Sequence, residues 1–391
     1  MTLLSPPQTL LPTPNNHALQ HSQHLSLHIQ SEIDSAGGWI NFARYMHLAL
    51  YTPELGYYSS NVTKFGSAGD FVTAPEISPL FAQTLARQVA QILQASSDQI
   101  LELGAGTGRL AAGLLTELTN LGKFPACYKI LEVSAHLQQV QRETLQAALP
   151  EHFMQRIEWL DSLPPTFSGL VLGNEILDAI PVHIISQYET SIHERGVAWD
   201  GQNFIWADQA LTSGHLFDLA HALSLPPGYT SEFCPAATGL LSSLATMLQT
   251  GVILFIDYGF SQREYYHPQR HQGTLMCHYR QYAHDNPFFY PGLQDITAHV
   301  DFTRLAEIGL ANGLLLLGYC NQTQFLINCG ITEILAQNSP EDMAKYLPLV
   351  AQAQKLLSPN EMGELFKTIA FGKNVAIPLL GFAQGDKRHT L

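Results

Sequence analysis

Two patterns of hydrophobic residues alternate along this chain, short continuous apolar runs and sets with helical spacing. Ile100, Leu101 and Leu103 form a continuous run, which is typical of a parallel strand covered on both faces. After a glycine-rich turn, the apolar positions from Leu110 to Leu118 have helical spacing. This strand, turn and helix form the unit around which we expect the rest of the fold to be organised.

The same alternation continues beyond this unit. Further strands are expected at residues 128–133, 157–159, 169–173, 251–257 and 314–319, with helices between them. This order predicts an α/β fold with a doubly wound, Rossmann-like parallel sheet. Toward its end, the chain is expected to form a helical block up to about residue 371 and a last strand over residues 374–380.

The regions before the first strand predict the domain organisation. Residues 1–30 are rich in Pro, Gln, Asn and His, and we expect them to form a flexible tail. Residues 31–98 are expected to form an N-terminal helical region, followed from Lys64 by a loop that folds over a ligand. Residues 99–391 are expected to form the main domain.

Two insertions are expected within this main domain. The first, at about residues 182–235, alternates with period two and contains the hairpin signal Asp200-Gly201. The second, at about residues 260–303, is rich in Tyr, His and Arg. We expect both insertions to build a substrate-binding surface.

The glycine-rich turn indicates a nucleotide-cofactor site. Gly104, Gly106 and Gly108 occupy every second position, and glycine lets the backbone turn sharply and lie against a ligand. The helix that follows points its free N–H groups toward the same place. The dinucleotide fingerprint is not met, because its sixth position, counted from Gly104, is Arg109.

Acidic residues flank this turn. Glu102 lies two residues before the first glycine, and Glu132 ends the next strand, where an acid suits ribose hydroxyls. The combination resembles the cofactor-binding region of class I S-adenosylmethionine-dependent methyltransferases, whose cationic ligand suits nearby carboxylates. A tight strand-to-helix turn without a ligand is the alternative interpretation.

Two further groups of residues are expected at the cofactor. Asp161 and Ser162 follow the third strand, where this fold meets an adenine ring, although Asp161 could equally cap a turn. Thr73, Pro75 and Glu76 belong to the covering loop, and the acid and the threonine could also act only in turns and caps. The predicted cofactor-binding residues are Glu102, Gly104, Ala105, Gly106, Thr107, Gly108, Glu132, Asp161, Ser162, Asn174, Thr73, Pro75 and Glu76.

Polar residues at the ends of the fourth and fifth strands indicate a catalytic site. In open α/β sheets, ligands lie at the carboxyl ends of the strands. Asn174, Glu175 and Asp178 follow the fourth strand and Asp257 ends the fifth, while His299 closes the second insertion, near an expected helix start. The predicted catalytic residues are Glu175, Asp178, Asn174, Asp257 and His299.

Composition narrows the range of partners. The 391 residues carry a net charge of −14, from 19 Lys and Arg against 33 Asp and Glu, which disfavours a nucleic-acid partner. Five widely spaced cysteines without a Cys-x-x-Cys pair suggest neither a zinc site nor a disulfide framework, and we predict no metal. No apolar run approaches the length that crosses a bilayer, and the first 30 residues contain no Lys or Arg. We therefore expect a cytoplasmic protein without a membrane partner.

Several longer motifs together resemble the MidA family of methyltransferases, whose eukaryotic members are mitochondrial complex I assembly factors. The resemblance covers nearly all of the chain after about residue 30, and it rests on Phe42–Tyr51, Gly56–Tyr58, Gly69–Ser78, Glu102–Gly108, Asn174–Pro181, Asp257–Gly259 and Asp295–Phe302. It implies a class I methyltransferase sheet, S-adenosyl-L-methionine as cofactor, and methylation of arginine on a protein substrate.

Because a guanidinium stays protonated in water, we hypothesise roles for the predicted catalytic residues in arginine methylation. Glu175, helped by Asp178 or Asp257, would hold the guanidinium through paired hydrogen bonds, and His299 would accept the released proton. Two other functions stay open, a non-catalytic assembly factor that binds a partner protein and a small-molecule methyltransferase. A nicotinamide-dependent oxidoreductase is the least favoured alternative.

Overall fold

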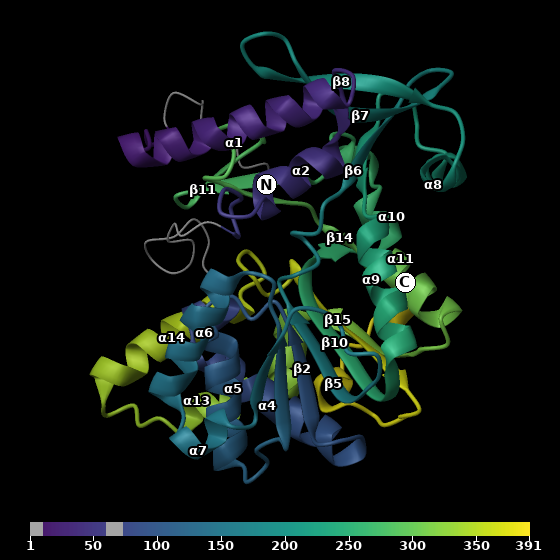
Figure 1. Cartoon of the computed structure of the whole chain (residues 1–391). Helices are drawn as coiled ribbons and strands as arrows, with labels where there is room; N and C mark the ends of the chain where they lie inside the picture. Colours follow the sequence, from purple (N-terminus) through teal and green to yellow (C-terminus); the bar gives the residue numbers. More distant parts are fainter. Residues whose placement is uncertain (1–10, 60–72) are drawn as a thin grey trace. The chain divides into compact units, whose positions relative to one another are not determined.

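The structure is a computed structural model, and it describes residues 11–59 and 73–391 (Figure 1). These residues divide into two compact units. Unit 1 takes in the described residues before 60 together with Asp178–Ala237 and Arg263–His299, and unit 2 takes in those from 73 to Leu177 together with Thr238–Gln262 and Val300–Leu391.

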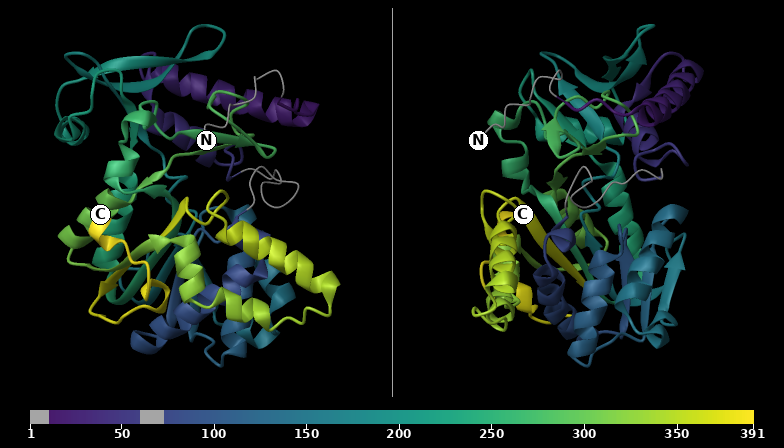
Figure 2. Two further views of the ribbon diagram at one scale, coloured as in Figure 1. Left: turned by 180° about the vertical axis from the view of Figure 1, so that it is seen from behind. Right: turned by 90° about the vertical axis from the view of Figure 1, so that its left-hand side faces the viewer.

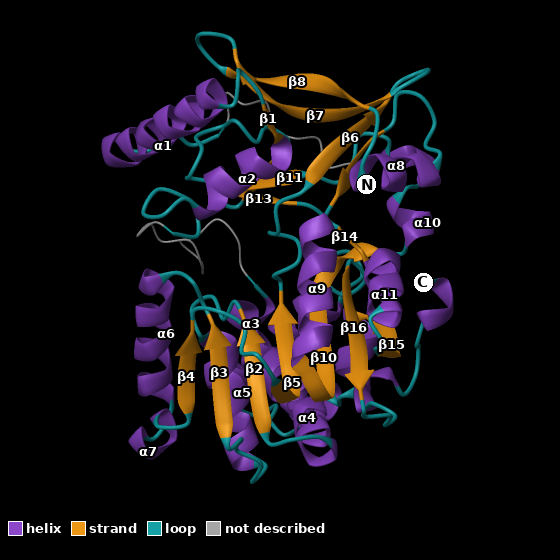
Figure 3. Ribbon diagram, turned by 45° about the vertical axis from the view of Figure 1, so that its right-hand side comes forward, coloured by secondary structure: helices purple, strands orange, loops and turns teal. Residues whose placement is uncertain are grey.

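Unit 2 is built on a sheet of eight strands, in the order β15-β16-β10-β5-β2-β3-β4, with β14 beside β10 (Figure 3). The strands from β4 to β10 are parallel, and β16 runs antiparallel to both β10 and β15. The strands are β2 (Gln99–Leu103), β3 (Cys127–Leu131), β4 (Ile157–Leu160), β5 (Phe167–Asn174), β10 (Leu248–Phe260), β14 (Val300–Asp301), β15 (Leu315–Asn321) and β16 (Phe366–Lys373). Chain order reverses at β2, which has β3 on one side and β5 on the other, and such a reversal is where this fold binds ligands.

Helices cover both faces of this sheet (Figures 2 and 3). In Figure 3, α4 and α5 lie behind the sheet, and α9 and α11 lie in front of it. The helices are α3 (Ala74–Ile77), α4 (Pro79–Ala95), α5 (Arg109–Asn120), α6 (Ala135–Ala148), α7 (Glu151–Met154), α9 (Pro235–Met247), α11 (Phe302–Ala311), α12 (Gln322–Asn328), α13 (Ile331–Ala336) and α14 (Met343–Leu357). The predicted α/β, doubly wound class is therefore confirmed.

The last strand of unit 2 corrects one prediction. The strand is β16 (Phe366–Lys373), which begins within the stretch expected to be helical, and the segment predicted as a strand, residues 374–380, lies entirely after it. The β16 residues are buried on both faces between β10 and β15. A short strand buried in this way shows no period of two, so its sequence cannot be told from the end of a helix.

Unit 1 contains the two expected insertions together with the N-terminal helices. A five-stranded antiparallel sheet has the order β1-β7-β6-β9, with β8 beside β7, and a three-stranded sheet has the order β12-β11-β13. The strands are β1 (Ile40–Asn41), β6 (His183–Gln187), β7 (Ile192–Trp199), β8 (Phe204–Leu211), β9 (Thr230–Phe233), β11 (Met276–Tyr279), β12 (Tyr282–His284) and β13 (Asp295–Thr297). The β7–β8 turn contains the predicted Asp200-Gly201 hairpin, and the Asp200 carboxylate accepts bonds from two backbone N–H groups within it.

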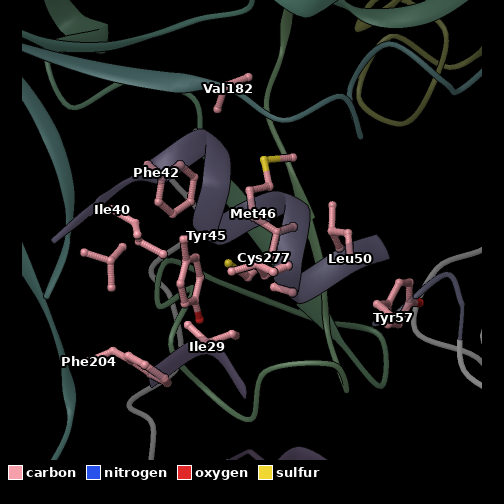
Figure 4. Close-up of a cluster of buried hydrophobic side chains, with 14 of the residues drawn as sticks. Ile29, Ile40, Phe42, Tyr45, Met46, Leu50, Tyr57, Val182, Phe204 and Cys277 are labelled. Atoms are coloured by element: carbon pink, nitrogen blue, oxygen red, sulfur yellow. The ribbon is translucent and has the colours of Figure 1, made fainter. Parts of the chain in front are cut away.

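The core of unit 1 joins residues that are far apart in the sequence (Figure 4). Ile29 of α1 (Asn16–Ser35) and Tyr45 of α2 (Phe42–Tyr51) pack in one buried cluster with Val182 and Cys277 from the two insertions. The insertions were predicted to belong to the main domain at 99–391. In the structure they fold with the N-terminal helices instead, because each supplies apolar residues to the same core.

Helix α1 corrects the prediction of a flexible tail over residues 1–30. From Asn16 onward this prediction is wrong, and residues 1–10 lie outside the described part. The Asn15 side chain caps the helix by accepting a hydrogen bond from the Ala18 backbone N–H. Leu25, Ile29 and Ile33 bury one face at helical spacing, while the many Gln and His residues elsewhere in the segment hide this pattern. Across the described parts of the chain, no helix has both the length and the apolar character needed to cross a membrane.

Candidate functional site

The glycine-rich turn follows β2 in unit 2, as predicted. Gly104 and Gly108 have φ angles of 62° and 81°, in the left-handed region that glycine adopts readily. A Cβ atom on Gly104 would lie 3.1 Å from the Cγ2 atom of Ile176, and one on Gly108 would lie 3.1 Å from the Cα atom of Gln141. Both backbone conformation and available space therefore require glycine here. Gly108 is also the N-cap of α5, so the free N–H groups of that helix begin at this turn.

Glu102 is buried on β2, with 2% of its surface exposed, and the hydroxyl of Tyr128 donates to its Oε2 atom at 2.8 Å. Burial raises the pKa of Glu102 to about 7, the bond from Tyr128 opposes this rise, and the charge of Glu132 adds to it. The structure thus places Glu102 as a buried partner of β3 just before the turn, where its proton is retained up to neutral pH.

This raised pKa predicts a pH-dependent stability. The folded state holds the Glu102 proton more tightly than the unfolded chain, whose Glu pKa is near 4.5. The stabilisation is therefore complete below about pH 4.5 and is lost as pH rises through about 7. A Glu102→Gln variant keeps an oxygen for Tyr128 and has no proton to lose. We expect the wild-type free energy of unfolding, relative to this variant, to fall by about 3 kcal/mol between pH 4.5 and pH 8. Urea unfolding at both pH values measures this difference, and parallel changes in the two proteins would contradict it.

Glu132 lies directly after β3, and its carboxylate is fixed from two sides. Its Oε1 atom accepts a bond from the backbone N–H of Ser134 at 2.9 Å, and its Oε2 atom accepts one from Nε2 of Gln141 at 3.1 Å. Val133, the next residue, is 75% exposed, and an apolar side chain in this position offers a surface for a planar ring. Sequence reasoning missed Val133, although its place directly after the acid was a usable signal.

Asp161 and Ser162 follow β4, and both are exposed. The side-chain amide of Gln138, on α6, donates to Asp161 Oδ1 at 3.2 Å and to the Glu132 carbonyl oxygen at 2.7 Å. The two predicted ribose and adenine acids therefore lie on neighbouring strand ends and are linked through one side chain. Gln138 was not predicted.

The short helix α3 connects the covering segment to the turn. Glu76 accepts a bond from the Thr107 hydroxyl at 2.6 Å and one from Nε of Arg109 at 3.1 Å. Thr73 is the N-cap of α3 without a side-chain capping bond, and Pro75 is buried in its first turn. Glu76 thus contacts the glycine turn directly. Residues 64–72 of the predicted covering loop lie outside the described residues.

Asn174 and Glu175 stand at the carboxyl end of β5. Glu175 has a φ angle of 53°, which is uncommon for a residue other than glycine and is typical of strained functional positions. Its Oε1 atom accepts bonds from the Ala74 backbone N–H and from Nδ2 of Asn174, both at 3.1 Å. Oδ1 of Asn174 is buried without a hydrogen-bond partner among the described residues, so it is an available acceptor for a ligand.

Asp257 was predicted to end the fifth strand, but that strand, β10, continues to Phe260, and from within it Asp257 supports the turn that carries Glu175. Its side chain is fully buried, and its Oδ2 atom accepts bonds from the backbone N–H groups of Ile176 at 3.0 Å and Leu177 at 2.7 Å. Its Oδ1 atom accepts a bond from the Tyr258 backbone N–H at 2.9 Å. These bonds fix both carboxylate oxygens of Asp257 against backbone N–H groups, and its catalytic role stays a prediction.

The other two predicted catalytic residues, Asp178 and His299, belong to unit 1. The Ala298 backbone N–H donates to the Asp178 carbonyl oxygen at 3.0 Å, which brings the two segments together within that unit.

Unit 1 also contains a buried pair of Tyr58 and Asp295. The Tyr58 hydroxyl donates to both carboxylate oxygens of the buried Asp295, at 2.9 and 3.0 Å. Burial first, and then the charge of Asp295, raises the pKa of Tyr58 well above its ordinary value, so its hydroxyl stays a donor.

The chain is similar to proteins described as methyltransferases. A family described as S-adenosyl-L-methionine-dependent methyltransferases matches residues 84–320. The chain is 29% identical over 407 residues to the mitochondrial protein arginine methyltransferase NDUFAF7 of Danio rerio, covering 91% of this chain and 92% of the relative. It is 28% identical to the Homo sapiens protein of the same name, covering 88% and 82%.

Two crystal structures from Burkholderia thailandensis resemble the whole molecule. One, bound to S-adenosyl-homocysteine, is 49% identical with a TM-score of 0.94, and covers 97% of this chain and all of its own. A native structure from the same organism, also 49% identical and with the same coverage, has a TM-score of 0.91.

Proposed function

Because the chain belongs to this family of S-adenosyl-L-methionine-dependent methyltransferases, we propose that it methylates arginine on a protein substrate. The arginine assignment is supported by the names of the relatives and by one feature of the site. This feature is Glu175, at the carboxyl end of β5, whose backbone is strained and whose carboxylate is held by a backbone N–H group.

The residues of unit 2 fit the cofactor. A Cβ atom on Gly104 or Gly108 would lie only 3.1 Å from a neighbouring residue, and glycine lets the backbone lie against a ligand. Glu132 offers a fixed carboxylate to ribose hydroxyls, and Asp161 offers one to an exocyclic amine. The buried Oδ1 of Asn174 suits an ammonium group. When bound, S-adenosylmethionine supplies an electrophilic methyl group on a sulfonium.

Glu175 would act on the arginine side chain. A guanidinium stays protonated in water, so its nitrogens are poor nucleophiles until a carboxylate pairs with them. Paired hydrogen bonds from the guanidinium to Glu175 would fix its plane and polarise it, leaving one nitrogen oriented for attack. The Ala74 N–H and the Asn174 amide hold the carboxylate in one place, which lowers the cost of ordering it. A helper role for Asp178 and a role for His299 as proton acceptor stay predictions from the sequence.

This proposal predicts which products carry the methyl group. Extract from cells that lack the gene, incubated with purified protein and S-adenosylmethionine with a labelled methyl, should yield labelled peptides whose label lies on arginine. Mass spectrometry locates the label, and a synthetic peptide with the modified arginine replaced by lysine is the matched control. Label found only in small molecules would favour a small-molecule methyltransferase. Cofactor uptake without any labelled product would favour a non-catalytic assembly factor. A role in complex I assembly and a cytoplasmic location stay predictions.

A further inference from the structure

Gln141, on α6 in unit 2, is fully buried and has a side-chain amide with three hydrogen bonds. Its Nε2 atom donates to the carbonyl oxygen of Gly106 at 3.0 Å and to Glu132 Oε2 at 3.1 Å. Its Oε1 atom accepts a bond from Nε1 of Trp159 at 2.9 Å. A single side chain therefore joins the glycine turn, the acid after β3 and the end of β4.

The orientation of this amide is determined by its partners. The indole N–H of Trp159 can only donate, so the amide oxygen must face it. The two amide hydrogens then point to the Gly106 carbonyl and to Glu132, which are both acceptors. Rotating the amide by half a turn would break all three bonds and would leave the fully buried Gln141 amide without these partners. The guanidinium of Arg142 lies 3.7 Å from the centre of the Trp159 ring and helps to hold the indole.

Gln141 therefore acts on the two parts of the site that meet the nucleoside. Ser134 N–H holds one oxygen of the Glu132 carboxylate and Gln141 holds the other, so the carboxylate has one orientation. The backbone of Gln141 also lies against Gly108, which couples α6 to the other end of the turn. Without the amide, the Oε2 atom of Glu132 would lose the bond that fixes its direction.

We propose that Gln141 is a positioning residue that sets the selectivity for the ribose of the nucleoside, by orienting Glu132 toward its hydroxyls. The inference rests on the proposed placement of the ribose at Glu132. It does not depend on which group accepts the methyl.

Calorimetry with three ligands tests this inference. The ligands are S-adenosylhomocysteine and its 2′-deoxy and 3′-deoxy analogues, with each protein's thermal unfolding measured without ligand. We expect the wild type to bind the deoxy analogues roughly 10- to 100-fold more weakly, as expected for hydrogen bonds to a charged acceptor. Gln141→Leu should bind S-adenosylhomocysteine about 10-fold or more weakly and the analogues nearly as the wild type does, so that their ratio approaches one.

Gln139→Leu is the matched control, because Gln139 lies exposed on the same helix and, within residues 11–59 and 73–391, its side chain bonds to the exposed Glu143 alone. It should keep the wild-type ratio. If Gln141→Leu does not fold, Trp159→Phe is the second variant, since it keeps an aromatic ring beside Arg142, removes the N–H that bonds the amide oxygen, and should lower the same ratio. A variant that weakens all three ligands equally, with an unchanged ratio, would show that Gln141 is merely structural. A wild type that does not distinguish the three ligands would also overturn the inference, whatever the methyl acceptor is.

Discussion

A Gly104→Val variant is expected to bind S-adenosylhomocysteine roughly 100-fold more weakly than the wild type and to lose methyl transfer. Gly104 has a φ angle of 62°, and a left-handed conformation costs a residue with a Cβ atom about 1–2 kcal/mol. The new Cβ would lie 3.1 Å from Ile176, and the two methyl groups beyond it add overpacking of about 1–3 kcal/mol. The turn must then shift, and with it the backbone that faces the cofactor.

Calorimetry measures the affinity, and Gly122→Val is the matched control. Gly122 has a φ angle of 67° and follows α5, but a Cβ there would meet nothing within 4 Å. The control should carry the same backbone strain and a lower melting temperature, while its affinity stays within about threefold of wild type. A folded Gly104→Val protein with wild-type affinity would show that this turn does not seat the cofactor.

A Glu175→Gln variant is expected to keep its cofactor affinity and to lose turnover by roughly 1,000-fold. Glutamine keeps one oxygen at this position, so the bonds from the Ala74 N–H and the Asn174 amide can persist. The negative charge is lost, and with it the pairing that orients a guanidinium. Binding and chemistry should therefore separate at this residue.

Single-turnover assays that follow the formation of methylated peptide measure turnover, and calorimetry measures cofactor affinity. Glu143→Gln is the matched control, because Glu143 is exposed on α6 and its carboxylate accepts a bond from the Gln139 side chain on the same helix. The Glu143→Gln variant should leave cofactor affinity and turnover unchanged. Wild-type turnover in Glu175→Gln would remove Glu175 from the chemistry and would return the catalytic role to another group.

The central part of the fold could be predicted from sequence because its signals are local. The apolar run of β2 and the glycines after it lie within ten residues, and the strand–helix alternation of unit 2 follows the same logic. Unit 1 could not be predicted in this way. Its β1 pairs with β7, with Ile40 opposite Val197, and no local pattern reveals a partner so far along the chain.

The site shows the same division. Spacing alone pointed to Glu132 and Asp161, whose strand ends prove to be linked through Gln138. The roles of Asp257 and Gln141 depend on burial and on their hydrogen-bond partners. The residues next to them in the sequence indicate neither. A glutamine in a polar helix gives no sign that it is fully buried.

Mass spectrometry of methylated arginines in cells tests whether this protein methylates arginine through Glu175. Two strains would be compared, one with the wild-type gene and one in which the gene encodes Glu175→Gln, with equal protein levels confirmed by immunoblot. We expect at least one peptide whose arginine is methylated in the first strain and unmodified in the second. Identical sets of methylated arginines in the two strains would contradict it.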